Sequence, residues 1–504
     1  MKLQNEVRKL YDNDRWLQYI LLVFMVLFYG IILSNARLHQ PTWPVNGTFN
    51  SMIDHLVHGQ FDVDPNTIGR EGYLCNGRVY AYFGITCALV RLPLLLFHRL
   101  DLDVTRWSCL IAVCLACMMK VKIVLFLRRY CGVTPASEWA FGLMLACIVL
   151  GGAAVGYLKA SIFQEVLYWA VGFAAVFVYF AVKGLVTGQF TAAELSWMAF
   201  AAGFATLTRV STGIGLCVAF GLLLLVLLAQ EFRARRSVFT RRFLIPVAIL
   251  AVLLIAVGTV NYYRWGNPAA FTGSTYLGNI DYPDRIPRVH TYGFFNLARI
   301  PLGLLYYFLP LWAMQGPDGR LLFEGTQTRL IDYLELPPSS FFLTDLLPIA
   351  FIVFLAIALW VGRRDLALNL RKEWGFTQRE ETQPPFRLFS PVQGLALAVG
   401  LAVPCVLMLT FISMNYRYRM EFYPEMDLLA FLGLYATVGN PALLARFNRC
   451  RRWMLAAAVV SIVSSFAMMV LYKISDWGPS QPLLRDGVVH YYVHHAVYFL
   501  HHGS

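Results

Sequence analysis

Long uninterrupted apolar runs constrain this chain more than any other feature of its sequence. The clearest runs occupy residues 16–36, 213–229, 243–260, 346–361, 392–414 and 453–471. A run of about 20 apolar residues forms a helix that spans a lipid bilayer. Only 14% of the 504 residues are charged, which is too little polar surface to cover a soluble core of this size. We therefore expect one all-α domain over residues 1–504, a polytopic transmembrane bundle of about 11–13 helices.

Clusters of Lys and Arg lie between the apolar runs and indicate the orientation. They occupy residues 1–15, 231–242, 363–387 and 446–452. Cytoplasmic loops carry such an excess of basic residues, so we expect all four clusters inside the cell. Three longer segments then lie outside, at residues 37–79, 266–343 and 474–504. The first two are expected to carry short interfacial helices, around residues 49–58 and 294–311.

The stretch 80–129 breaks this alternation. It contains two apolar runs, 80–98 and 107–127, followed by Arg128 and Arg129. If the two arginines are cytoplasmic, one of the runs cannot cross the membrane completely. A half-buried or re-entrant segment would restore the count, and the sequence does not decide which run forms it.

The net charge of +13 could indicate a nucleic-acid partner. We exclude nucleic acid, because the basic residues lie in short loops between membrane spans. Cys114 and Cys117 have the spacing of a metal-binding pair, but they lie in an apolar helix without His or carboxylate partners. No metal ligands are therefore assigned. The His-rich end, from His490 to His502, is interpreted as an amphipathic interfacial segment.

The first outer loop holds four carboxylates, Asp54, Asp62, Asp64 and Glu71. Asp54 lies in an apolar, helix-compatible context soon after the first span. A carboxylate at a membrane surface suits a general base, which takes a proton from an acceptor hydroxyl or amine. We therefore predict that Asp54 is catalytic, with Asp62 and Asp64 in reserve. A solvated loop residue or a helix cap is the structural alternative.

Arg78, Tyr80 and Tyr82 lie where the first loop enters the next apolar stretch. The planar guanidinium of an arginine can bind a lipid phosphate through two parallel hydrogen bonds. Arg78 is therefore a candidate phosphate ligand, and the two tyrosines are candidate substrate contacts. Snorkelling of the arginine within an aromatic belt is the alternative.

Glu165 and Arg209 fall at the ends of apolar helices, away from the basic loops. An ionisable residue there is costly to bury, so a functional role is the default hypothesis. We assign Arg209 to a donor phosphate and Glu165 to the substrate. The structural alternative is that these two residues form an ion pair with each other.

Arg264 and Arg417 complete the set of candidate phosphate ligands. Arg264 follows an apolar helix, and Arg417 lies in a short outer loop beside Tyr418 and Glu421. Outer loops seldom keep arginines, so a negative group should lie opposite. A lipid phosphate or pyrophosphate fits that requirement, with Tyr418 and Glu421 as substrate contacts. Glu421 as a structural counter-charge is the alternative.

Together these stretches resemble the GT-C superfamily of membrane glycosyltransferases, which includes glycosyltransferase family 39-like enzymes and lipid A aminoarabinose transferases. The resemblance covers most of the chain as architecture. As motif it rests on the first-loop acid, Asn-Gly-Arg78-Val-Tyr80-Ala-Tyr82-Phe-Gly, Leu-Thr-Arg209-Val-Ser, Asn-Tyr-Tyr-Arg264-Trp-Gly-Asn-Pro, and Arg417-Tyr418 with Glu421 and Pro424.

The resemblance implies a multi-pass enzyme of the bacterial cytoplasmic membrane whose site faces the periplasm. Such an enzyme moves a hexose or pentose, with inversion, from a polyprenyl-phosphate donor to a glycan, lipid or protein acceptor in cell-envelope polysaccharide biosynthesis. Asp54 is the base that the resemblance implies. The paired acidic motif that some relatives use for a metal is not evident, so no cofactor is assigned, and a divalent cation (Mg²⁺ or Mn²⁺) stays open.

Two other classes compete with this interpretation. A lipid-linked oligosaccharide polymerase or ligase would also use outer arginines and would not need Asp54. A lipid or glycan transporter predicts internal repeats and carboxylates or broken helices at mid-membrane. The sequence shows no repeat, and its charged residues cluster at the outer helix ends, which favours glycosyl transfer.

Overall fold

The computed structural model describes residues 2–34, 44–273, 275–281, 284–310, 314, 324–335, 339–363, 389–474, 480–481 and 487–502. The basic segment expected at 363–387 lies almost wholly outside these residues. So do parts of the three expected outer segments.

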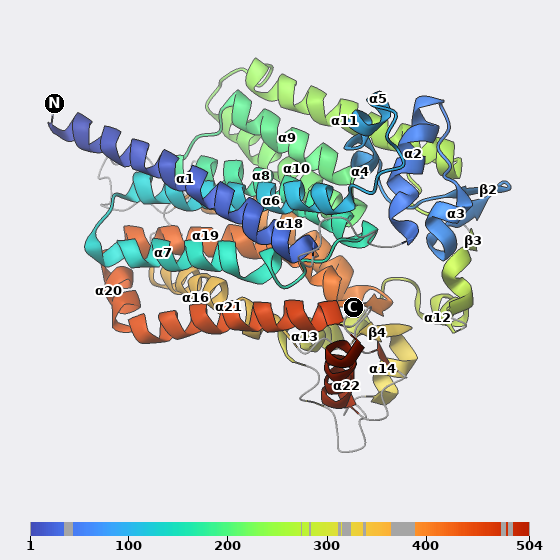
Figure 1. Cartoon of the computed structure of the whole chain (residues 1–504). Helices are drawn as coiled ribbons and strands as arrows, with labels where there is room; N and C mark the ends of the chain where they lie inside the picture. Colours follow the sequence, from blue (N-terminus) through green and yellow to red (C-terminus); the bar gives the residue numbers. More distant parts are fainter. Residues whose placement is uncertain are drawn as a thin grey trace.

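Long apolar helices form the body of the molecule and lie in one bundle (Figure 1). They are α1 (Lys2–Ser34), α6 (Thr105–Cys131), α7 (Pro135–Leu150), α8 (Ile162–Thr187), α9 (Ala192–Thr206), α10 (Val210–Arg233), α11 (Arg241–Trp265), α16 (Leu346–Val361), α18 (Pro391–Thr410), α19 (Tyr423–Gly439) and α21 (Arg451–Ile474). Among the described residues, eight helices are long and apolar enough to cross a membrane, or up to nine if a bent pair forms one span.

The helical class expected from the sequence is therefore confirmed, and these helices have the length and composition that several membrane passes require. The finer expectation of about 11–13 membrane helices stays a prediction. Helices α9 and α16 have only 15 and 16 residues, so they are shorter than a typical span. The structure contains no membrane, and the expected orientation is likewise untested.

The ambiguous stretch 80–129 is resolved by the lengths of its helices. The run 107–127 lies within the 27-residue helix α6. The run 80–98 forms only α4 (Thr86–Leu89) and α5 (Leu92–Leu96), which are far too short to cross a bilayer. The segment that does not cross is therefore the first of the two runs.

The sequence predicts one helix over the apolar stretch 426–445, and the structure shows that this prediction is wrong. Helix α19 ends at Gly439, and α20 (Pro441–Arg449) turns away from it by 102°. The side chain of Asn440 caps α20 by accepting hydrogen bonds from the amides of Ala442 and Leu443. Pro441 lacks an amide hydrogen, so it begins the new helix and cannot extend the old one.

Short elements gather at the end of the bundle opposite α20 (Figure 1). The helices among them include α2 (Thr48–Val57), α3 (Pro65–Ile68), α12 (Arg285–Tyr292), α13 (Ile300–Phe308), α14 (Glu324–Leu330), α15 (Phe341–Thr344) and α22 (Gly487–His502). Helices α2 and α13 confirm the short helices expected around 49–58 and 294–311. The 3-10 segments η2 (Gly69–Glu71) and η7 (Tyr416–Phe422) matter below.

Two small sheets connect these short elements. The first has the order β2 (Arg78–Tyr80), β1 (Tyr73–Cys75), β3 (Thr275–Tyr276), and the second has the order β5 (Ser413–Met414), β4 (Tyr333–Glu335), β6 (Ser480–Gln481). In the first sheet, the antiparallel pair β1–β3 joins the first expected outer loop to the second. In the second, β4 pairs in parallel with β5, just before η7. The sheets thus fix both loops against the end of the bundle.

Helices α10 and α18 approach each other closely through small residues. A Cβ atom on Gly400 would overlap the backbone of Ala219, and one on Gly215 would overlap the ring of Pro404. Small residues allow membrane helices to pack with their backbones in contact. This contact positions the end of α18, from which the chain continues into η7.

We predict that Gly400→Ala destabilises the bundle, because the added methyl group forces α10 and α18 apart at a cost of about 1–3 kcal/mol. Gly221→Ala is the matched control, since a Cβ atom on Gly221 meets nothing within 4 Å. That control should be neutral or stabilising, as alanine favours a helix over glycine by about 1 kcal/mol. Thermal unfolding in detergent measures both, and equal melting temperatures for the two variants would contradict the close packing.

Candidate functional site

A cavity of about 250 Å³ lies where the long helices meet the short elements. It is lined by residues from the first outer loop, from the ends of α8 and α11, from the junction between α9 and α10, from α18 and from η7. Three of the four arginines assigned to a phosphate line it, together with two of the tyrosines assigned to the substrate: Arg209, Arg264, Arg417, Tyr82 and Tyr418. These residues are scattered over more than 300 positions of the chain, and the fold brings them together.

The junction between α9 and α10 forms one wall of the cavity. The amides of Gly84 and Thr86 donate to the carbonyl oxygens of Thr208 and Leu207, which satisfies acceptors left free at the end of α9. A Cβ atom on Gly84 would overlap the carbonyl of Leu207, so only glycine permits this approach. The first loop is thereby fastened beside Arg209.

Arg264 is the most unusual charge in the cavity. Its side chain is 4% exposed, yet the described part of the chain offers it no carboxylate partner. Its Nη1 donates to the carbonyl oxygen of Phe83 at 2.7 Å, its Nη2 lies 3.4 Å from the sulfur of Met52, and its Nε has no hydrogen-bond partner there. A buried cation without a counter-charge is costly, so the site favours an anionic ligand.

Arg209 differs, because its charge is already balanced. Its Nε donates to the carboxylate of Glu421, which also accepts hydrogen bonds from Ser211 at 2.6 Å and Thr212 at 2.5 Å. The ring of Tyr418 lies 5.4 Å from the guanidinium carbon. Glu421 is therefore a structural counter-charge, although for Arg209 and not for Arg417.

Arg417 lies between aromatic rings and carboxylates. Its guanidinium carbon is 4.4 Å from the ring centre of Phe163 and 5.8 Å from that of Tyr418. Two carboxylates interact with it electrostatically, those of Glu71 and Glu335. The three cavity arginines therefore differ. Among the described residues, Arg264 has no carboxylate partner, Arg209 is paired with Glu421, and Arg417 interacts with two carboxylates.

Glu71 is a second candidate for the general base that the sequence analysis assigns to Asp54. It ends η2, two residues before Tyr73, which lines the cavity. Its Oε2 accepts a hydrogen bond from the hydroxyl of Tyr276 at 3.1 Å. Burial raises the pKa of Glu71 above its ordinary value, although the charge of Arg417 acts in the opposite direction. A carboxylate with a raised pKa is a stronger base than an ordinary glutamate once it is ionised.

An apolar groove of about 430 Å³ adjoins the cavity. The two share Thr206, Val257 and Phe271 as lining residues. The rest of the groove is formed by residues of α10, α11 and the turn that follows α11: Ile214, Cys217, Val218, Leu254, Gly258, Pro268 and Ala269. Helix α11 is largely unburied and strongly apolar, so in a membrane this groove would face lipid.

Five residues assigned to the site from the sequence do not line the cavity: Asp54, Arg78, Tyr80, Glu165 and Glu421. Asp54 is exposed on α2, where its backbone oxygen accepts from His58 at 2.8 Å. Arg78 is also exposed and lies 3.7 Å from Asp62. Tyr80 packs on Trp265, with ring centres 5.5 Å apart. The roles of Asp54 and Arg78 remain untested.

The two reserve carboxylates are engaged elsewhere. Asp62 accepts from His55 at 3.1 Å. Asp64 caps α3 by accepting from the amide of Asn66 at 2.9 Å. Neither lines the cavity.

Glu165 is paired with Arg91, so the alternative in which it pairs with Arg209 is wrong. The two side chains are fully buried and form a bidentate contact, with Nη2 of Arg91 2.8 Å from Oε2 of Glu165. Arg91 also donates to the carbonyl oxygen of Cys87 at 2.8 Å. Sequence reasoning missed this pair because 74 residues separate its members. Its position fastens the non-crossing segment to the start of α8.

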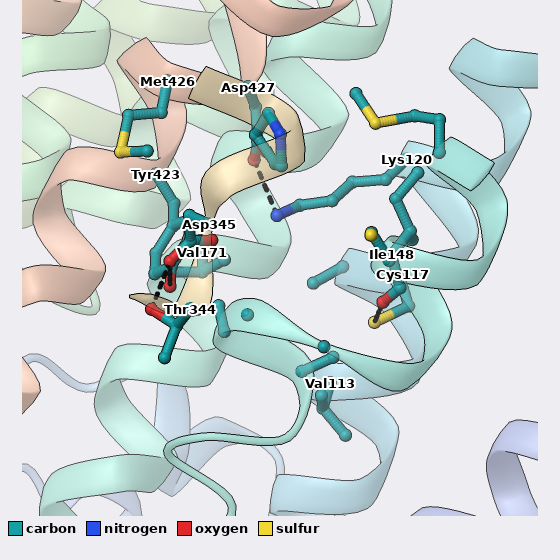
Figure 2. A pocket seen from close by; sticks show the side chains of 18 of the residues that line it. Val113, Cys117, Lys120, Ile148, Val171, Thr344, Asp345, Tyr423, Met426 and Asp427 are labelled. Atoms are coloured by element: carbon teal, nitrogen blue, oxygen red, sulfur yellow. Dashed lines mark hydrogen bonds and ion pairs between the residues drawn. The ribbon is translucent and has the colours of Figure 1, made fainter. Parts of the chain in front are cut away.

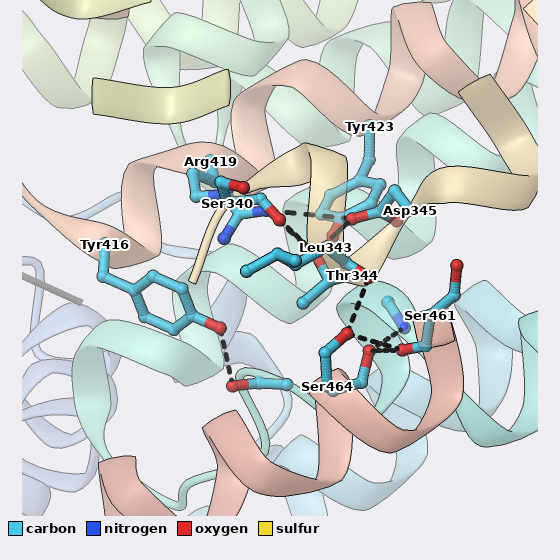
Figure 3. A network of polar contacts seen from close by, with 12 residues as sticks. Ser340, Leu343, Thr344, Asp345, Tyr416, Arg419, Tyr423, Ser461 and Ser464 are labelled. Carbon is cyan, nitrogen blue, oxygen red and sulfur yellow. Dashed lines mark hydrogen bonds and ion pairs between the residues drawn. The ribbon is translucent and has the colours of Figure 1, made fainter. Parts of the chain in front are cut away.

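A second polar region lies inside the bundle (Figures 2 and 3). Lys120 of α6 and Asp427 of α19 form an ion pair of 2.7 Å beside a cavity of about 50 Å³. Arg419 donates to Thr344 at 2.9 Å and lies 3.8 Å from Asp345. The expectation that charges cluster at the helix ends is therefore wrong for Lys120, which lies in the interior of α6.

Among the residues that are described, no group of three or more His, Cys, Asp or Glu side chains could hold a metal ion. Dependence on Mg²⁺ or Mn²⁺ stays a prediction. Within the His-rich end, Nδ1 of His495 lies 2.9 Å from the carbonyl oxygen of Tyr491, one turn earlier in α22.

We predict that Glu165→Gln or Arg91→Met alone destabilises the protein by about 3–5 kcal/mol, because each leaves a buried charge without its partner. The double variant Arg91→Met/Glu165→Gln should recover much of that loss, since no buried charge remains. Melting temperatures in detergent compare the three. If the double variant is as unstable as the sum of the singles, the pair is not coupled as the structure indicates.

Comparison of the chain with protein-family models, with curated proteins and with solved structures finds no match.

Proposed function

We propose that this protein is a membrane glycosyltransferase that moves a sugar from a polyprenyl-phosphate donor to an acceptor at the outer boundary of the membrane. One observation carries the proposal. Arg209, Arg264 and Arg417 line a single cavity that adjoins an apolar groove. A cationic cavity beside a lipid-facing groove matches a ligand with an anionic head and a long apolar tail.

In this proposal the donor phosphate lies against Arg264 and Arg417. Arg264 supplies a guanidinium with an unused donor and no carboxylate among the described residues. Arg209 contributes less, because Glu421 already balances its charge. The prenyl tail leaves the cavity past Val257 and lies between α10 and α11. Because the tail already lies in the bilayer, the groove orients it through packing and does not remove it from water.

The reaction needs one base and several cations. The base takes the proton of the acceptor hydroxyl, whose oxygen forms a new bond to the anomeric carbon of the sugar. The bond from that carbon to the phosphate oxygen breaks, and the phosphate leaves with the electron pair. The arginines stabilise the negative charge that develops on the phosphate. The configuration at the anomeric carbon inverts, because the acceptor attacks from the side opposite the phosphate.

We assign the base to Glu71 in place of Asp54. Glu71 interacts electrostatically with Arg417, Tyr73 and Tyr82, all of which line the cavity. Neither carboxylate lines the cavity itself, but Asp54 is exposed to solvent, whereas Glu71 is partly buried. A general base must come within hydrogen-bond reach of the acceptor proton. The interactions of Glu71 with these cavity residues therefore favour it over Asp54.

The competing classes make different demands. A lipid-linked oligosaccharide polymerase or ligase would place a pyrophosphate against the same arginines, so the identity of the preferred lipid separates it from the proposal. A transporter would use the interior region around Lys120 and Asp427. That region has only about 50 Å³ of free space, enough for a few water molecules and too small for a sugar or a lipid head group.

Arg264→Met should weaken binding of polyprenyl monophosphate by about 10–100-fold, because a charged hydrogen bond contributes about 1.5–3 kcal/mol. Arg78→Met is the control, since Arg78 lies outside the cavity. Thermophoresis of the full chain in nanodiscs measures both affinities. Equal losses for the two variants, or none for Arg264→Met, would remove the cavity from donor binding.

Glu71→Gln should abolish sugar transfer while leaving binding of polyprenyl monophosphate nearly intact, since only the proton acceptor is lost. Asp54→Asn should keep its activity. Release of polyprenyl phosphate from a panel of polyprenyl-phosphate sugars measures transfer. The opposite pattern, with an inactive Asp54→Asn and an active Glu71→Gln, would restore Asp54 as the base.

The rate of transfer should fall as the pH decreases through the pKa of Glu71, because the base works only when ionised. Burial raises that pKa, so the loss should occur at a higher pH than for an ordinary glutamate. The pH dependence of kcat at saturating donor measures this, and a kcat that rises on acidification would contradict the assignment.

A further inference from the structure

Glu335 lies behind the cavity, next to the segment that carries Arg417. It is the last residue of β4 and only 4% exposed. Its Oε2 accepts a hydrogen bond of 2.7 Å from the amide of Tyr416, the residue immediately before Arg417. Strand β4 also pairs in parallel with β5, with Leu334 opposite Met414. Glu335 thus holds the backbone from which Arg417 projects to the cavity.

The charged and titratable groups that face Glu335 come from several elements. Arg417 of η7 and Lys159, just before α8, are the cations that stabilise its ionised form. Tyr306 of α13 and Tyr472 of α21 also interact with its charge. Burial raises the pKa of Glu335 to about 7, although Arg417 acts in the opposite direction. Near neutral pH this carboxylate is therefore partly protonated.

Among the described residues, the carboxylates of Glu71 and Glu335 both interact electrostatically with Arg417, and Glu71 lies two residues before the cavity residue Tyr73. An anion that enters the cavity competes with both for the guanidinium. It also opposes the ionisation of Glu335, because like charges repel. Binding of an anion and uptake of a proton by Glu335 are therefore coupled.

We propose that Glu335 is a positioning residue for Arg417 and its proton-linked counter-charge, so that the cavity binds an anionic phosphate more tightly when Glu335 is protonated. This inference rests on the proposed binding of a lipid phosphate in the cavity. Affinity is highest at low pH and falls as the pH rises above about 7, since the free protein must then give up the favourable ionised state of Glu335.

The two roles of Glu335 are separable by substitution. Glu335→Gln keeps an oxygen that accepts from the amide of Tyr416 and removes the charge. Glu335→Leu removes both. Glu71→Gln is the matched control, because it makes the same chemical change on the other acid that faces Arg417.

The test is the affinity of the full chain, in nanodiscs of zwitterionic lipid, for farnesyl methyl phosphate. This phosphodiester carries one fixed negative charge, so its own ionisation does not change between about pH 6 and about pH 8. Wild type should lose affinity across that range. Glu335→Gln should bind tightly throughout, about fivefold better than wild type at about pH 8 if binding raises the pKa of the carboxylate from about 7 by one unit. Glu71→Gln should keep the loss of affinity near neutral pH.

Glu335→Leu should bind weakly at every pH, because Arg417 is no longer held in position. A Glu335→Gln variant with the pH dependence of wild type would overturn the inference and leave the proposed function standing. Absence of binding by wild type at every pH would contradict the proposed function, and the inference with it.

Discussion

The burial of the Arg264 guanidinium without a carboxylate is the constraint on which this account depends. Among the other buried cations that the structure describes, Arg91 and Lys120 pair with Glu165 and Asp427, Arg419 lies 3.8 Å from Asp345, and Arg299 donates to four backbone carbonyl oxygens. Arg264 donates to only one carbonyl oxygen and a sulfur, and its Nε has no hydrogen-bond partner among the described residues. Burying a charge without compensation is expensive. We therefore propose that the cavity beside Arg264 binds an anion and that the adjoining apolar groove takes its lipid tail.

The remainder of the fold serves to hold this arrangement at the end of the bundle. The glycine contacts between α10 and α18 fix the helix that leads into η7. The Arg91–Glu165 pair fastens the non-crossing segment, and Gly84 lets the first loop lie against the end of α9. The two small sheets then connect the outer loops to each other and to η7. Each of these contacts involves only a few residues, and together they place residues that are far apart in the sequence around one cavity.

Much of the helical architecture could be predicted from the sequence, and the reason is physical. A membrane span must satisfy its backbone hydrogen bonds internally, so a long apolar run has few alternatives to a helix. The exceptions had local causes, such as Pro441, which ends a predicted helix early. The run 80–98 could not be distinguished from a span by composition alone.

The candidate site was predicted only in part. Arg209, Arg264 and Arg417 were recognised because arginines are rare outside basic loops. Their partners were not, because ion pairs such as Arg209–Glu421 join residues 212 positions apart. The sequence favoured Asp54 over Glu71 because the neighbours of Asp54 are apolar and compatible with a helix. The pairing of β1 with β3, which depends on residues 200 positions later, brings the hydroxyl of Tyr276 to Glu71, and the sequence gives no local sign of it.

An experimental structure of the protein with bound polyprenyl phosphate tests the central claim most directly. The phosphate should lie within hydrogen-bond distance of Arg264, with the prenyl chain running between α10 and α11. A phosphate bound at the exposed Arg78, or a chain bound away from that groove with the cavity empty, would contradict the account.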